Sequence, residues 1–82
     1  MKFKKDNFVI YYILRYEHGR PWMNHKDMYG GLVGDICRVT KIRPFENVHV
    51  FNFRTKRYCE YHNSNLRYAT PIEIMQWRIK NE

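Results

Sequence analysis

The stretch "GGLVGDICRVTKIRPFENVHVFNFRTKRYCEYH", residues 30–62, decides the fold of this 82-residue chain. After the glycines, an apolar alternation predicts a strand over residues 35–42. "RPFEN" predicts the turn that follows, because Pro44 suits an early turn position and Asn47 tolerates positive φ. Residues 48–53 and 58–62 continue as strands. The stretch therefore predicts an antiparallel meander of three strands.

A two-residue turn at Thr55 and Lys56 fixes the expected pairing of the second and third strands. It sets the pairs His49 with His62, Phe51 with Glu60 and Phe53 with Tyr58 on one face. The alternate residues form the other face, which we predict to be core: Val48, Val50, Cys59 and Tyr61.

The glycines at the start of the stretch do not form a nucleotide-phosphate loop. Such a loop follows a strand and opens a helix, whose N-terminal amides face the phosphate. Here the glycines precede a strand, and Gly34 is followed by Asp35 and Ile36 instead of a lysine and a hydroxyl residue. We therefore look for a binding surface in place of nucleotide chemistry.

Outside this stretch, three further elements are expected. "FVIYYIL", residues 8–14, is a short apolar run typical of a strand buried on both faces. Residues 15–30 carry Gly19, Pro21 and Asn24 and predict a long loop. "LRYAT", residues 66–70, predicts a short strand.

A C-terminal helix over residues 71–82 is marked by its start. Thr70, Pro71 and Glu73 fit the N-cap, first and third positions of a capping box with a proline start. On this helix Ile72, Met75 and Ile79 form a stripe that we expect to dock on the sheet. Ile74 and Trp77 then point outward, toward a partner protein or a second copy of the chain in a homodimer.

The spacing of glycines and apolar residues resembles the opening of KOW-type modules and other small SH3-like barrels over residues 30–70. The residues that carry the resemblance are Gly31, Gly34, Ile36, Val39, Ile42, Val48 and Val50. The resemblance implies a partly open, strongly bent barrel that binds nucleic acid or transcription machinery. We expect a mostly β (α+β) fold in one domain, residues 1–82: a small SH3-like antiparallel β-barrel of about five strands over 1–70, then the helix.

Composition narrows the class of partner. A net charge of +7 favours polyanions such as nucleic acid, or an acidic protein surface. No run approaches the roughly 20 apolar residues of a membrane span, so none is expected. Two cysteines, Cys37 and Cys59, are too few for a disulfide framework and fit buried, reduced thiols in a cytoplasmic protein.

Metal binding and catalysis were both considered, and neither is predicted. Cys59 and His62 have metal-ligand chemistry, but residues three apart in a strand point to opposite faces. The loop residues His18, His25, Asp27 and Tyr29 come without a nucleophile motif. We therefore predict a protein that is not an enzyme and has no metal or cofactor.

The favoured candidate site combines aromatic and basic residues. Single-stranded nucleic acid binds where aromatic rings lie beside cations. The residues assigned to such a site are Phe51, Phe53, Arg54, Lys56, Arg57 and Tyr58. In the alternative interpretation, the N-terminal strand or the helix covers this face and the rings are core.

A second function class remains open. The short, basic, aromatic chain is similar in composition to small accessory proteins of T-even-type bacteriophages. That resemblance implies a regulator that inhibits a host or phage protein, for example an antiholin-like lysis regulator or a polymerase-binding protein. Ile74 and Trp77 are then the contact residues.

Overall fold

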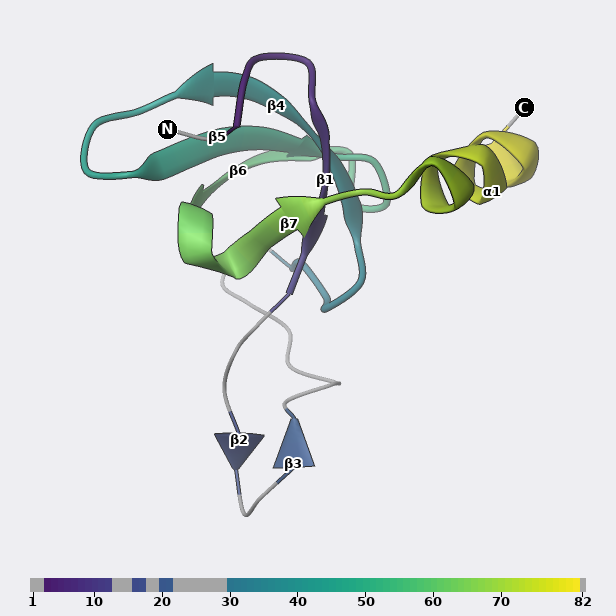
Figure 1. Ribbon diagram of the computed structural model, residues 1–82, viewed down its shortest axis with the longest axis horizontal. Coiled ribbons are helices and arrows are strands. Elements are labelled where there is room, and N and C mark those ends of the chain that lie inside the picture. Colours follow the sequence, from purple (N-terminus) through teal and green to yellow (C-terminus); the bar gives the residue numbers. More distant parts are fainter. Residues whose placement is uncertain (1–2, 13–15, 18–19, 22–29, 82) are drawn as a thin grey trace.

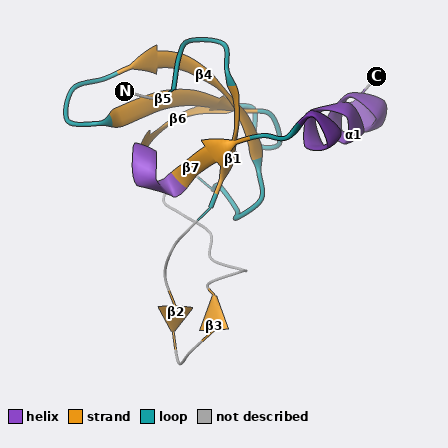
Figure 2. Ribbon diagram, viewed as in Figure 1, coloured by secondary structure: helices purple, strands orange, loops and turns teal. Residues whose placement is uncertain are grey.

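The computed structural model describes residues 3–12, 16–17, 20–21 and 30–81. Its main sheet has five antiparallel strands in the order β6-β5-β4-β1-β7 (Figure 1). These are β1 (Phe8–Tyr11), β4 (Ile36–Ile42), β5 (Asn47–Asn52), β6 (Arg57–His62) and β7 (Leu66–Tyr68). The 3-10 turn η1 (Asn63–Asn65) links β6 to β7, and helix α1 (Pro71–Asn81) follows β7. The predicted mostly β architecture with one C-terminal helix is confirmed (Figure 2).

The predicted loop over residues 15–30 contains a short ladder. Strand β2 (Tyr16–Glu17) pairs with β3 (Arg20–Pro21). The side chains weighed there for catalysis, at positions 18, 25, 27 and 29, lie outside the described residues.

The sheet curls strongly without closing. The rings of Tyr11 on β1 and Tyr61 on β6 stack with centroids 4.3 Å apart, although two strands separate β1 from β6 in the sheet. Within the described residues, β6 and β7 are the two edges and do not pair with each other, so the bent sheet is not closed into a barrel. The chain leaves β7 after three residues and enters the helix at Pro71, which leaves too short a strand to complete a ladder with β6.

The core lies on the concave face of the curled sheet. Val48, Val50, Cys59 and Tyr61 are buried there, as predicted. The other members of the core are Phe3, Val9, Tyr11, Cys37, Val39 and Leu66. Strand β1 is buried on both faces, as expected, because Ile10 on its other face is only 4% exposed.

Of the three residues of β4 that were expected in the core, two face the core and one does not. The pairing of β4 with β5 shifts between Val39 and Lys41, and the extra residue lets both Val39 and Ile42 face the core. Ile36, expected inside a barrel, precedes buried Cys37 and so points to the opposite, outer face, where it is half-buried.

The pairing of β5 with β6 is shifted by two residues from the prediction. Phe51 pairs with Tyr58 and His49 with Glu60, while His62 lies opposite Asn47. The cause is the turn, which holds four residues, 53–56, because the Asn52 side chain accepts hydrogen bonds from the Arg54 and Thr55 amides at 2.9 and 3.2 Å. A shift of two keeps every residue on its predicted face.

The turn between β4 and β5 also departs from expectation. Positive φ falls on Phe45 and Glu46, both at 61°, and not on Asn47. Glu46 is held on both sides: its carbonyl oxygen accepts from the Asn63 amide at 2.9 Å, and its carboxylate lies 3.6 Å from the His62 ring nitrogen.

The helix begins as predicted, but the face that packs on the sheet is the opposite of the expected one. Thr70 Oγ1 accepts from the Glu73 amide at 3.2 Å, and Glu73 Oε1 accepts from the Thr70 amide at 2.9 Å, which confirms the capping box. Ile72, Met75 and Ile79, expected to dock, are 61%, 55% and 71% exposed. Ile74 and Trp77, expected outward, are half-buried.

The rotation of the helix is set by an ion pair that joins it to β7. Arg67 donates two hydrogen bonds to the Glu73 carboxylate, both at 2.8 Å, so Glu73 faces the sheet. Residues four apart share a helix face, so Trp77 faces the sheet as well. The stripe that includes Ile72 and Met75 is left on the far side.

Candidate nucleic-acid interface

Six aromatic rings form a connected cluster on the outer face of the sheet. We call this cluster the aromatic face; its members are Phe8, His49, Phe51, Phe53, Tyr58 and Trp77. Tyr58 contacts both His49 and Phe51, with ring centroids 5.7 and 5.0 Å apart. Phe51 continues the cluster to Phe53 at 5.5 Å. The structure thus brings together the three predicted aromatic residues Phe51, Phe53 and Tyr58.

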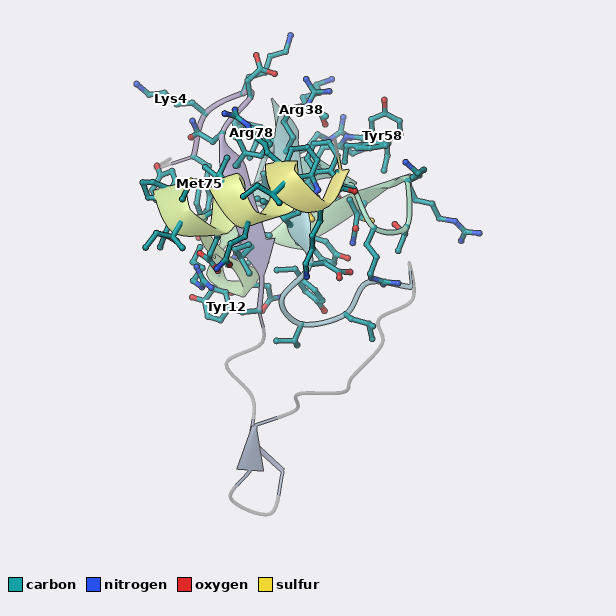
Figure 3. All side chains as sticks on the ribbon, turned by 90° about the vertical axis from the view of Figure 1, so that its right-hand side faces the viewer. Lys4, Tyr12, Arg38, Tyr58, Met75 and Arg78 are labelled. Carbon is teal, nitrogen blue, oxygen red and sulfur yellow. The ribbon has the colours of Figure 1, made fainter. Side chains whose placement is uncertain are left out.

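The register of the sheet places these rings. Phe8, Arg38, Phe51 and Tyr58 are successive partners across β1, β4, β5 and β6, so they form one row on the outer face. All four alternate with core residues, which directs their side chains away from the core. Tyr58 ends the row on the edge strand and is 59% exposed. Figure 3 labels Arg38 and Tyr58 on the same upper side of the molecule.

The helix covers one end of the aromatic face. Trp77 packs on Phe53 and Phe8 with ring centroids 4.5 and 5.8 Å apart. Phe8 and Phe53 also stack on each other at 5.9 Å. At this end the rings serve as packing, as in the alternative interpretation, whereas the Tyr58 end is open.

Cations of β4 line the aromatic face. Arg38 stands in the row between Phe8 and Phe51 and forms an exposed ion pair with Asp6 at 3.3 Å. Lys41 is exposed at the bulge opposite His49, and no ion pair joins it to the described residues. These two cations were missed from the sequence because only the strand order places them beside the rings of β5 and β6.

The three predicted basic residues differ in their surroundings. Arg54 is tied to the fold, because its Nε donates to Asp35 at 2.7 Å and its guanidinium also reaches the Gly30 carbonyl oxygen. Lys56 is exposed in the turn, with φ of 57°. Arg57 is exposed and pairs with Asn52. In the alternation of β6 it lies on the same face as Cys59, which is the opposite face from Tyr58.

Asp35 anchors this end of the sheet. Its buried carboxylate accepts from the Arg54 side chain, from Asn52 Nδ2 at 2.9 Å and from the Leu32 amide at 2.8 Å. Burial raises the pKa of Asp35, but the hydrogen bonds from Arg54, Asn52 and Leu32 together outweigh it and hold that pKa below its usual value. Asp35 also neutralises Arg54, so Arg54 contributes less to the field at the aromatic face than the sequence suggests.

A concavity of about 330 Å³ lies beside the open end of the aromatic face. Its lining residues are Arg43, His49, Tyr58, Cys59 and Glu60. Arg43 Nε lies 3.3 Å from the Glu60 carboxylate. The Thr40 hydroxyl donates to the His49 carbonyl oxygen at 2.9 Å and lies 2.8 Å from His49 Nδ1.

The residues considered for metal binding point apart. Cys59 is buried on the concave side, whereas His62 is exposed and bonds Ser64 through Nδ1 at 2.8 Å. Among the described residues, no three His, Cys, Asp or Glu side chains gather closely enough to hold a metal ion. In the same part of the chain, no helix is both long and apolar enough to cross a membrane.

Comparisons with protein-family models, with curated proteins and with solved structures find no match to this chain.

Proposed function

We propose that this protein is a small regulatory binding module, without catalytic activity, that holds single-stranded nucleic acid across the aromatic face. The observation that carries the proposal is the unbroken contact of His49, Tyr58, Phe51 and Phe53 on the outer face of an open sheet. Every base offers a flat π surface, and each stacked base contributes about 1–3 kcal/mol.

Charge supports the same partner. Arg38 and Lys41 stand beside the rings on β4, and Lys56 lies in the turn before β6. Phosphates that follow the rings along the sheet would pass these cations. The net charge of +7 acts at longer range and favours encounter with a polyanion.

The test is binding of a labelled oligothymidine of about 12 nucleotides, a length within the range of single-strand binding sites, followed by fluorescence anisotropy. Tyr58→Ala should weaken binding about fivefold or more, because it removes the most exposed stacking ring. Tyr58→Phe should bind like the wild type, because it keeps the ring.

Tyr68→Ala is the matched control. Tyr68 is also exposed, but its ring contacts Phe3 on the other side of the sheet, at 4.9 Å. Its loss should leave affinity unchanged, and log affinity of the wild type should fall linearly with log salt, by about 0.7 per phosphate contact. Equal affinities for Tyr58→Ala and wild type would exclude the aromatic face as the site.

A second candidate function is favoured by the far side of the helix. The exposed apolar stripe of Ile72, Met75 and Ile79 lies on the outward face that was predicted for Ile74 and Trp77. We propose it as the contact if the chain acts as an inhibitor of another protein or forms a homodimer. Binding through this stripe would persist at high salt, whereas polyanion binding would not.

A further inference from the structure

We propose that the concavity beside Tyr58 is a pocket for one nucleobase and that it prefers guanine. This inference rests on the proposed function, because the base would belong to the strand held on the aromatic face. The volume of about 330 Å³ is at the small end of the range for ligand pockets, about 300–1,000 Å³, and suits a single base.

The pocket offers a stacking surface with polar groups on one side. The Tyr58 and His49 rings stack nearly parallel, at 15°, so a base that extends the cluster can stack in the same orientation on the free face of one ring. The Glu60 carboxylate, an acceptor, lines the same concavity as the cationic donor Arg43. A carboxylate beside a guanidinium matches a base edge that carries N–H groups next to an acceptor oxygen.

The ion pair inside the pocket can exchange partners. Within the described residues Glu60 pairs with Arg43 alone, at 3.3 Å, which is longer than the roughly 2.7–2.9 Å of a strong charge-assisted hydrogen bond. The Glu60 side chain is 39% exposed, so a ligand can reach the carboxylate without unfolding the strand.

Guanine matches this set of groups. Its Watson–Crick edge has two neighbouring donors, N1–H and N2–H, beside the acceptor O6. A carboxylate accepts both donors at once, and an arginine beside it donates to O6. Adenine, cytosine and thymine each present a single donor group on that edge, so Glu60 would leave one acceptor oxygen unused.

The experiment measures anisotropy for oligothymidines of about 12 nucleotides that carry one central guanine, inosine, adenine or cytosine. With the wild-type protein, the guanine strand should bind about fivefold or more tightly than the others, the range of a good bidentate contact. Inosine lacks the N2 amino group and should lose most of this preference.

Glu60→Gln should bind all four strands alike, because the amide replaces one acceptor by a donor. Glu46→Gln changes the charge equally, but Glu46 pairs with His62 outside the pocket, so it should keep the guanine preference. Equal affinity of wild type for all strands, with Tyr58→Ala still weaker, would overturn the guanine pocket and leave the proposed function intact. No measurable binding of any strand would overturn both.

Discussion

Glu73 links β7 to the start of α1 through one carboxylate. It accepts two hydrogen bonds from Arg67 on β7, and one from the Thr70 amide at the start of α1. The hydrogen bond from Arg67, followed by that from the Thr70 backbone, lowers the pKa of Glu73 from 4.5 to about 2, and the same pair raises the pKa of Arg67. The capping residue therefore also sets which helix face meets the sheet.

The lowered pKa gives a pH-dependent stability. Because the folded-state pKa of Glu73 lies below the unfolded value, its contribution is complete above about pH 4.5 and is lost as pH falls toward about 2. Glu73→Gln should lower the free energy of unfolding at pH 7 by up to about 1 kcal/mol, as expected for an exposed pair. Urea unfolding at pH 7 and near pH 2 measures this. The deficit should shrink at the low pH, and a deficit of equal size at both would contradict the assignment.

At the scale of elements, the turn between β4 and β5 places a bulky residue in a conformation that suits asparagine or glycine. Phe45 has φ of 61° and is 90% exposed, so its ring has no packing to offset the left-handed backbone. Phe45→Asn should raise the free energy of unfolding by about 1 kcal/mol. Phe45→Leu keeps the unfavourable backbone and should show no gain. If both variants unfold at the same urea concentration, the left-handed turn is not the cause.

Truncations on the two faces of the helix should change the free energy of unfolding by different amounts. Trp77→Ala removes a ring packed on Phe53 and Phe8 and should lower the free energy of unfolding by about 1 kcal/mol or more, with loss of helical circular dichroism. Ile79→Ala removes a side chain that is 71% exposed and should change stability by about 0.5 kcal/mol or less. The opposite ranking would restore the orientation expected from the sequence.

Local patterns predict elements better than they predict their relations. The alternation around Val48, Val50, Cys59 and Tyr61 predicts the strands and the buried face, because a period of two needs no knowledge of the partner strand. Register and helix rotation depend on contacts between distant side chains. The amide hydrogen bonds of Asn52 lengthen one turn, and the pairing of Arg67 with Glu73 rotates the helix.

At the scale of the whole molecule, the sequence predicts some residues of the candidate site and not others. Phe51, Phe53 and Tyr58 were placed on one face by alternation alone, and the structure joins them. Phe8, Arg38 and Trp77 enter from β1, β4 and α1, so only the strand order and the helix rotation reveal them. The assignment of Arg54 did not anticipate Asp35, 19 residues earlier in the chain, as its partner.

The most direct test of the central claim is a two-dimensional NMR titration of the labelled protein with an oligothymidine. We predict that shifts concentrate on the ring and amide protons of His49, Phe51, Phe53 and Tyr58. Residues of the concave core and of the exposed helix stripe, such as Ile72 and Met75, should stay unchanged. Shifts confined to that stripe, or spread over the surface without preference for the aromatic face, would contradict it.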